Sequence, residues 1–272
     1  MRFIRYLPVL LLVTGFLCSC SPSKREPVTL AEDVNEYRLV LATAVKPYTM
    51  TTNHNVVVLV NGNPVGLLSA MTDSMMMPLN LWIHKGANSV YLTGTSEREF
   101  EMYVTQYPFE ALCGSAEVLL KDDVKSEPLM FEVTDDIKSP LDNATTFADK
   151  KSLSDDARDF LREINTLIKN HDYKKFVSQS KDKDVFLTTL YDVDYSDIVS
   201  EAESYWEEHI KDLPLIDIEA LKYVIGESAI LIYHESDCAP PSFDDDAPTP
   251  VMVNNKLTPV VMVKINDTWM LW

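Results

Sequence analysis

The chain is poor in glycine and in positive charge. Seven of its 272 residues are glycine, which argues against the glycine-rich loops that cradle nucleotide phosphates. Lysine and arginine together number 24, against 42 acidic residues, so the formal net charge is −18. A surface of that charge repels phosphate backbones, and we therefore expect no nucleic-acid partner. Hydrophobic residues make up 46% and charged residues 24%, as in an ordinary folded globular chain.

The sequence also lacks the residue patterns of common catalytic and metal sites. It contains no Gly-x-Ser-x-Gly, no P-loop, no Rossmann fingerprint and no cysteine–histidine nucleophile pattern. No two of its five histidines stand three or four residues apart, as the ligands of many zinc sites do. We therefore expect neither a metal nor a cofactor. The histidines are His54, His84, His171, His209 and His234.

The first twenty residues have the pattern of an exported lipoprotein. Residues 1–5 form a short basic region, and residues 7–17 form an apolar run too short to span a membrane as a mature helix. The run ends in Leu17-Cys18-Ser19-Cys20, which resembles the bacterial lipobox, with an aliphatic residue three before the acylated cysteine and a small one just before it. The resemblance implies a lipoprotein signal peptide over 1–19 and lipidation of Cys20. An ordinary secretory signal is the alternative.

The lipobox resemblance also predicts where the protein is located. Several acyl chains on Cys20 would anchor it stably to a lipid bilayer on the exported side. Ser21 beside the cysteine resembles the context for sorting to the outer membrane of a Gram-negative bacterium. Residues 20–33 are polar and contain proline, so they read as a tether. Removal of residues 1–19 takes away Arg2 and Arg5 and leaves a net charge of −20.

Two further cysteines, Cys113 and Cys238, fall in different halves of the chain. Exported compartments are oxidising, so a disulfide between them is allowed and would staple the halves together. Two separate buried thiols are the alternative, because a sequence does not show the Cα separation that a bridge needs.

Residues 34–135 have the period of β-strands. Tyr37, Leu39 and Leu41 alternate with other residues, and 56–60 is a continuous apolar run followed by Asn61-Gly62, a strong hairpin signal. Further strands are predicted over 65–68, 79–83, 90–92, 100–104 and 129–133. Met71, Met75, Met76 and Met77 lack interleaved histidine or cysteine, so core packing or a soft contact surface is favoured over copper binding. Six to eight short strands predict an all-β antiparallel sandwich.

A polar linker is predicted over 136–151, and the period becomes helical beyond it. Phe160, Leu161, Ile164, Leu167 and Ile168 form one apolar stripe. Two more helices are predicted around 173–177 and 198–210, and strands over 216–225, 229–233, 251–253 and 260–265. The turn Asn266-Asp267 leads into a last strand. The change of period predicts two separately folded bodies, the second over 152–272.

The second body resembles a known superfamily. The segments Ile168-Lys169-Asn170-His171-Asp172-Tyr173-Lys174-Lys175-Phe176 and Lys264-Ile265-Asn266-Asp267-Thr268-Trp269-Met270-Leu271-Trp272 are similar to the nuclear transport factor 2-like, or cystatin-like, domains. The resemblance implies an α+β cone-shaped roll, with three helices packed on a curved antiparallel sheet. Some members use the pocket of the cone for catalysis or ligands, and others fill it with side chains. Trp206, Tyr223 and Trp269 are the candidate pocket residues.

Two functions are left open by these patterns. The first is a non-catalytic binding or interaction lipoprotein, and its negative charge favours a basic protein partner. The second is an exported enzyme that uses an acid–base pocket in the second body, for which His234 is the candidate because it stands at a strand end. Beside His234, the acidic loop 234–250 reads as a solvated or partner-facing segment rather than a calcium site. The first function is favoured because no catalytic pattern is present.

Overall fold

A computed structural model of the chain describes residues 34–43, 54–69, 74–96, 100–107, 117–123, 127–147, 150–235 and 257–272. The predicted signal peptide, the tether, Cys20, Cys113, Cys238 and most of the acidic loop lie outside these ranges. Lipidation of Cys20 and a Cys113–Cys238 disulfide therefore stay predictions.

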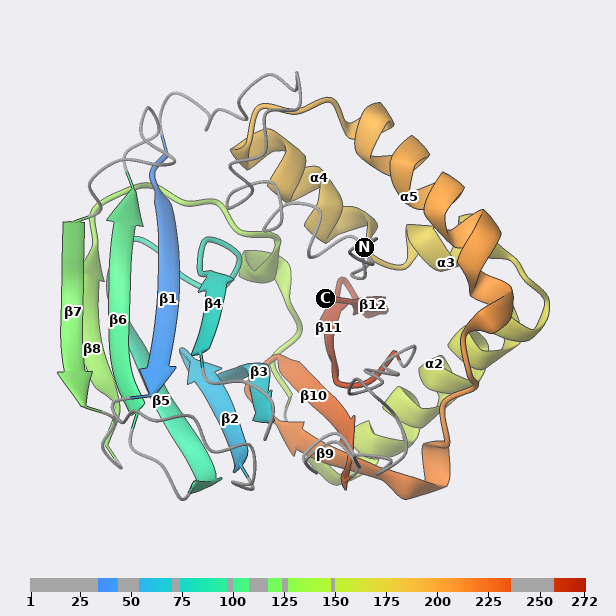
Figure 1. Cartoon of the computed structure of the whole chain (residues 1–272), viewed down its shortest axis with the longest axis horizontal. Coiled ribbons are helices and arrows are strands. Elements are labelled where there is room, and N and C mark those ends of the chain that lie inside the picture. The colour runs from blue at the N-terminus through green and yellow to red at the C-terminus, as the bar shows by residue number, and fades with distance from the viewer. Residues whose placement is uncertain are drawn as a thin grey trace, which may run out of the picture.

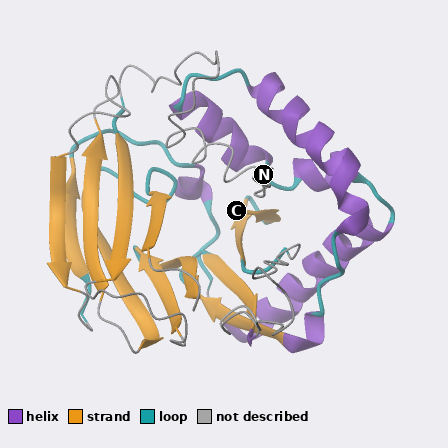
Figure 2. Cartoon of the chain, in the orientation of Figure 1, coloured by secondary structure: helices purple, strands orange, loops and turns teal. Residues whose placement is uncertain are grey.

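The described chain is a mixed α/β structure with three four-stranded antiparallel sheets (Figures 1 and 2). The first sheet has the order β4-β1-β6-β7, the second β3-β2-β5-β8 and the third β12-β11-β10-β9. The eight strands of the first two sheets all precede residue 135, which agrees with the predicted strand-rich first half. The strands are β1 Glu36–Thr43, β2 His54–Val60, β3 Asn63–Ser69, β4 Ser74–Pro78, β5 Gly86–Ser96, β6 Phe100–Tyr107, β7 Glu117–Asp123, β8 Leu129–Val133, β9 Leu221–Ile225, β10 Ala229–His234, β11 Val260–Ile265 and β12 Thr268–Leu271.

Four α-helices lie between β8 and β9, one more than the sequence predicts. They are α2 Lys150–Lys169, α3 Tyr173–Ser178, α4 Lys181–Leu190 and α5 Tyr195–His209. Three short 3₁₀ helices accompany them, η1 Pro140–Asn143, η2 Ile210–Asp212 and η3 Ile218–Ala220. The unpredicted helix is α4. Helix α5 has an acidic start, because the Asp194 side chain caps it by accepting a hydrogen bond from the Ser196 amide at 2.7 Å.

Both predicted hairpin turns are confirmed. Asn61 and Gly62 have φ angles of 48° and 75° and join β2 to β3, with Val60 paired to Asn63. Asn266 and Asp267 have φ angles of 48° and 62° and join β11 to β12. Positive φ at both central positions is what a two-residue type I′ hairpin requires, and Asn, Asp and Gly adopt it at the least cost.

The predicted strand over 79–83 is instead a buried turn. Leu79, Leu81 and Ile83 are at most 2% exposed, so the apolar pattern reflects burial and not pairing. The fully buried Asn80 accepts a hydrogen bond from the Tyr37 amide at 2.8 Å and donates one to the Asn35 carbonyl at 2.8 Å. A side-chain amide thus takes the place of the neighbouring strand backbone beside β1.

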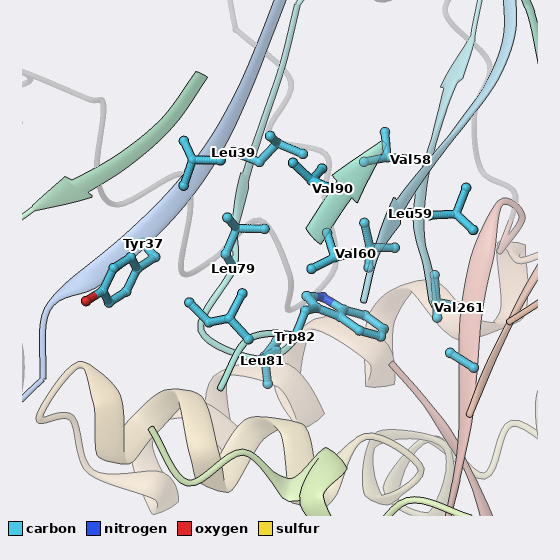
Figure 3. Close-up of a cluster of buried hydrophobic side chains, with 14 of the residues drawn as sticks. Tyr37, Leu39, Val58, Leu59, Val60, Leu79, Leu81, Trp82, Val90 and Val261 are labelled. Atoms are coloured by element: carbon cyan, nitrogen blue, oxygen red, sulfur yellow. The ribbon is translucent and has the colours of Figure 1, made fainter. Parts of the chain in front are cut away.

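Within the second sheet, β2 and β3 are buried on both faces, whereas β8 leaves Met130 and Glu132 exposed on one face. Val58 and Val60 lie on the side of Leu39 and Leu79, whereas Leu59 points towards Val261 of the third sheet (Figure 3). All five residues from Val56 to Val60 are at most 7% exposed and belong to one hydrophobic cluster that also includes side chains of the first and third sheets. Burial on both sides explains why β2 is continuously apolar rather than alternating.

The third sheet is also covered on both faces. Ala229, Leu231, Val261 and Val263 pack into the cluster shared with the first two sheets. The residues between them point the other way, into a second cluster with the apolar stripes of α2, α3 and α5. The third sheet therefore separates the helices from the other strands, and Figure 1 shows these three helices as an outer arc.

Close backbone contacts join the two halves of the chain. The Asn63 side-chain oxygen accepts hydrogen bonds from the amides of Ser228 and Ala229 at 2.7 and 3.1 Å. A Cβ on Gly226 would lie 2.6 Å from the Gly62 carbonyl oxygen, so the turn before β10 packs directly on the β2–β3 hairpin. At the C-terminus, Trp272 makes an edge contact with Trp82, with ring centroids 6.1 Å apart.

The described part of the predicted linker is held in the same way. Ile137 and Ser139 are 5% exposed, and the Ser139 hydroxyl donates a hydrogen bond to the Leu81 carbonyl at 2.7 Å. The Thr145 amide donates to the Lys264 carbonyl and the Phe147 amide to the Glu227 carbonyl, each at 2.7 Å. The domain boundaries stay a prediction, but the segment between them is docked and the two halves share a core.

We expect the two halves to unfold together and Asn63→Ala to destabilise both. The substitution leaves the Ser228 and Ala229 amides without their acceptor, which should cost roughly 1–3 kcal/mol. Urea unfolding followed by tryptophan fluorescence and by far-ultraviolet circular dichroism measures this, and the two curves should coincide. Asn170→Ala, on the exposed turn after α2, is the control. Two separate transitions, with only one shifted by Asn63→Ala, would contradict a shared core.

Candidate docking groove

Helix α4 has an unusual distribution of polar and apolar residues. Lys183, Asp184 and Thr188 are at most 6% exposed, whereas Val185 is 40% exposed. An amphipathic helix on a core normally has the opposite arrangement. The inversion is partial, because Leu187 and Leu190 are buried in the core. The polar residues buried beside them weaken the apolar stripe by which a helix is recognised, and this is why the sequence did not reveal the helix.

The inward face of α4 carries a buried charged pair. Burial lowers the pKa of Lys183 and raises the pKa of Asp184, and the charge of each residue opposes the shift of the other. The Ser180 hydroxyl donates a hydrogen bond to Oδ2 of Asp184 at 2.7 Å. The second carboxylate oxygen, Oδ1, is buried without a hydrogen-bond partner among the described residues. Charged groups in such surroundings are costly, so the orientation of α4 needs other support.

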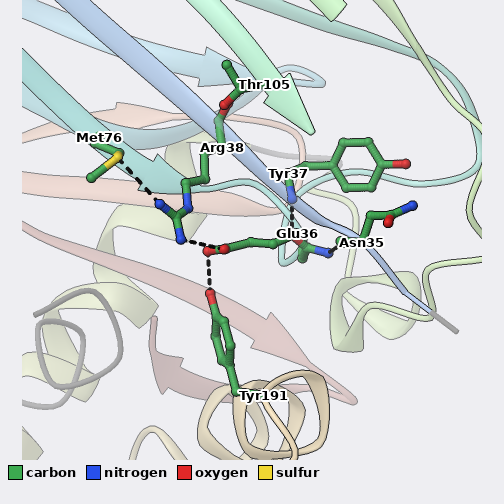
Figure 4. Close-up of polar contacts among 8 residues, drawn as sticks. Asn35, Glu36, Tyr37, Arg38, Met76, Thr105 and Tyr191 are labelled. Atoms are coloured by element: carbon green, nitrogen blue, oxygen red, sulfur yellow. Dashed lines mark hydrogen bonds and ion pairs between the residues drawn. The ribbon is translucent and has the colours of Figure 1, made fainter. Parts of the chain in front are cut away.

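That support comes from the C-terminal end of the helix (Figure 4). The Tyr191 hydroxyl donates a hydrogen bond to Oε1 of Glu36 at 2.7 Å, and Oε2 of Glu36 pairs with the Arg38 guanidinium at 2.5 Å. All three side chains are at most 5% exposed. Arg38 also lies 4.4 Å from the centre of the Tyr107 ring. The network fixes α4 to β1 at the point where the described chain begins.

The pKa values of this network follow from its burial. Burial, and then the Glu36 carboxylate, raises the pKa of Tyr191 well above the usual value of 10. Burial alone would lower the pKa of Arg38, but Glu36 outweighs it and raises the value. The tyrosine is therefore a neutral hydrogen-bond donor, and the arginine neutralises the glutamate. None of the three side chains lines the groove or the smaller hollow described below, so we assign the network a structural role.

The outward face of α4 lines an open groove of about 860 Å³. Val185, Phe186 and Leu190 supply apolar surface from the helix, and Ile137 and Pro140 supply it from the docked segment opposite. The groove also includes Val34, the first described residue, so it lies where the predicted tether joins the fold. The groove therefore leaves one exposed and one half-buried apolar side chain of α4, Val185 and Phe186, at its surface.

The charged side chains of the groove are mostly acidic. Asp136 and Asp142 stand exposed on the docked segment, and Asp182 lies in the first turn of α4. Lys138 is the one basic residue among the lining side chains that the structure describes. The groove therefore combines an apolar base with a negative rim, a surface suited to a cationic amphipathic ligand.

The three candidate pocket residues all contribute to the cluster between the third sheet and the helices. Trp206 on α5 is 6% exposed and makes an edge contact with Phe176, with centroids 4.9 Å apart. Tyr223 on β9 and Trp269 on β12 are half-buried against the same cluster. Phe147 lies 5.8 Å from Trp269. These residues do not line the α4 groove or the smaller hollow described next.

A smaller hollow of about 240 Å³ lies near the end of β10. His234 and the exposed Asp217 both line it, together with Thr258. The rest of the lining is apolar, from Pro214, Leu215, Ile216 and Leu257. The hollow thus places a histidine and a carboxylate at one site, but without an enclosed polar cavity around them.

Within the described ranges, no group of three or more His, Cys, Asp or Glu could hold a metal ion. No helix in those ranges has the length and apolarity to cross a membrane. Two methionines of β4 differ in their surroundings. Met76 is 43% exposed, and its sulfur lies 3.9 Å from the Arg38 guanidinium. Met77 is partly buried and packs against the core.

Comparison with known proteins adds no relative. No protein-family model, curated protein or solved structure matches the chain.

We expect Tyr37, beside Asn80 on β1, to make the fold sensitive to alkali. Burial, and then the Asp135 carboxylate, raises the pKa of Tyr37 to about 12. The unfolded chain loses this proton near pH 10, so the stability that Tyr37 confers is full below pH 10 and lost as the pH rises through about 12. The free energy of unfolding in urea should be lower at pH 11 than at pH 9, and Tyr37→Phe should reduce the difference.

Tyr173→Phe, on α3, is the control for this measurement. In this variant the free energy of unfolding should still fall between pH 9 and pH 11 as in the wild type, because Tyr37 and the lysines that lose their protons at high pH are unchanged. An equal fall in stability for the wild type and Tyr37→Phe would contradict the assignment to Tyr37.

Proposed function

We propose that the chain is an exported lipoprotein, anchored through acylated Cys20, that binds a protein partner in the α4 groove without catalysing a reaction. The observation that carries the proposal is α4 itself, which buries Lys183 and Asp184 and leaves Val185 exposed beside an open apolar groove. The lipobox resemblance of residues 17–20 supports the anchor. A tether that joins the fold beside the groove would hold the folded part of the protein, and with it the groove, away from the membrane.

The finer architecture is also proposed. The first two sheets would form a β-sandwich and the helices with the third sheet a cystatin-like roll. The shared hydrophobic cluster between the first two sheets supports the sandwich, and the helices against the third sheet support the roll. The filled space around Trp206 supports a roll whose concave face is packed with side chains.

The charge of the molecule supports a basic partner. The net charge of −18 attracts a cationic protein over long range and raises its association rate at low salt. Such a role would suit an inhibitor or immunity-type protein that faces a cationic toxin.

An exported enzyme with an acid–base pocket is the second candidate. The hollow that His234 and Asp217 both line is the observation that favours it. It ranks second because Asp217 is exposed and most of the lining is apolar, whereas acid–base catalysis usually relies on groups held in polar, water-restricted sites.

We expect a partner to be captured at the groove in intact cells. A photo-crosslinking amino acid in place of Val185 should give a discrete protein adduct after irradiation. The same amino acid in place of Val118, which is 53% exposed on β7, should not give that adduct. Adduct formation should fall when Asp142→Asn and Asp182→Asn are combined with it, because they weaken the attraction for a basic partner. Identical adducts from both positions, or none from position 185, would remove the support for the groove.

We expect Cys20 to carry the lipid. Metabolic labelling with an acyl analogue should label the wild type and Cys18→Ala but not Cys20→Ala, which should also leave the membrane fraction. Equal labelling of Cys20→Ala would contradict the assignment. Loss of labelling in Cys18→Ala alone would move the lipid to Cys18.

A further inference from the structure

We propose that the element bound in the α4 groove is a cationic amphipathic α-helix of the partner protein. The inference rests on the proposed function and names the chemistry of its partner. Three features of the groove carry it: the elements that form its walls, the spacing of side chains on α4, and the sign of the charges on its rim.

The walls favour a helix over a strand. A bound strand needs the free edge of a sheet to complete its hydrogen bonds. The groove is lined by α4, by η1 and by the segment that precedes η1, so its described lining includes no strand. A helix satisfies its own backbone groups, and it needs only apolar contact along one face.

The side chains of α4 form the ridges that a helix packs against. Asp182, Phe186 and Leu190 follow one another at intervals of four, and Val185 and Thr189 form the neighbouring row. Rows at i and i+4 leave a furrow that accepts the corresponding row of a second helix, the commonest mode of helix packing. Leu190 is already buried, so the bound helix would cover Phe186 and Val185 in particular.

The carboxylates at the edges of the groove determine which charge the bound helix should carry. Asp182 flanks the furrow on α4, while Asp136 and Asp142 flank it on the opposite wall. Lysine or arginine on both sides of an apolar stripe would therefore meet carboxylates on both walls. The same carboxylates repel anionic helices, fatty acids and acidic lipid headgroups, so the rim selects for a cation.

A designed peptide tests the inference directly. The probe is an 18-residue helical peptide of leucine, lysine and alanine, with leucines at intervals of three and four. The peptide is added to fragment 21–272. This fragment contains every described residue, so the described contacts are all retained in it. Fluorescence anisotropy should show saturable binding at low salt that weakens as salt rises. A peptide with glutamate in place of lysine, and one with the leucine spacing scrambled, should bind at least about tenfold more weakly.

Matched variants locate the binding. Val185→Asp should lower the affinity for the lysine peptide by about tenfold or more, because it removes the apolar contact. The loss is expected even though the substitution adds a favourable negative charge. Val118→Asp adds the same charge on β7 and should change the affinity less than about twofold. Combining Asp142→Asn with Asp182→Asn should weaken binding and flatten its salt dependence, whereas Asp212→Asn, exposed on η2, should do neither.

Failure of this inference can be told apart from failure of the proposed function. Equal binding of the lysine and glutamate peptides, or binding that Val185→Asp leaves unchanged, would overturn the cationic helix. Binding to phosphatidylglycerol vesicles that Val185→Asp abolishes would overturn it in favour of a lipid surface. If the peptides fail while the crosslinked adduct at position 185 persists, the groove still binds a protein and only the helix is wrong. If the adduct is absent as well, both proposals fall.

Discussion

The structure depends on four strands that are buried on both of their faces, β2, β3, β10 and β11. β2 faces the first sheet on one side, and its neighbour β3 contacts β9, β10 and β11 of the third sheet, so the halves of the chain share a hydrophobic cluster (Figure 3). Removing either half would expose the apolar residues of these strands that face the other half, at a cost of about 25 cal/mol for each Å². Segment 136–147 is docked for the same reason. A mobile linker joins two domains that each cover their own apolar surface, whereas these two halves cover one another.

Local turns and stripes could be predicted from the sequence, but the joining of the halves could not. Asn61-Gly62 and Asn266-Asp267 determine their hairpins because they tolerate positive φ at both central positions. The apolar stripe of α2 is also a local signal, because residues close together in the sequence determine which face of the helix is buried. In contrast, the contact of Asn63 with Ser228 spans 165 residues and has no periodic signal. The continuous apolar runs of β2 and β10 were the available indication, since a strand buried on one face alternates.

The candidate groove was missed for a related reason. Its helix has Lys183 and Asp184 at inward positions, so the usual rule places them on the surface and gives the segment no amphipathic period. Asp182 and Asp184 in the first turn after Ser180 were a local signal of a helix start that the sequence did contain. The groove also needs Ile137 and Pro140, which are brought opposite α4 only by tertiary contacts.

The inversion of α4 connects stability to the proposed binding. Burying Asp184 with one unpaired oxygen is unfavourable, and leaving Val185 in water forgoes a further apolar contact. The Tyr191–Glu36–Arg38 network holds the helix in this orientation through hydrogen bonds that are themselves buried and satisfied. A helix rotated to bury Val185 would break the Tyr191 hydrogen bond and leave the Glu36 carboxylate buried with one partner fewer. The network therefore holds Val185 and Phe186 at the groove in one fixed orientation, so the proposed binding of a partner there would cost little conformational entropy.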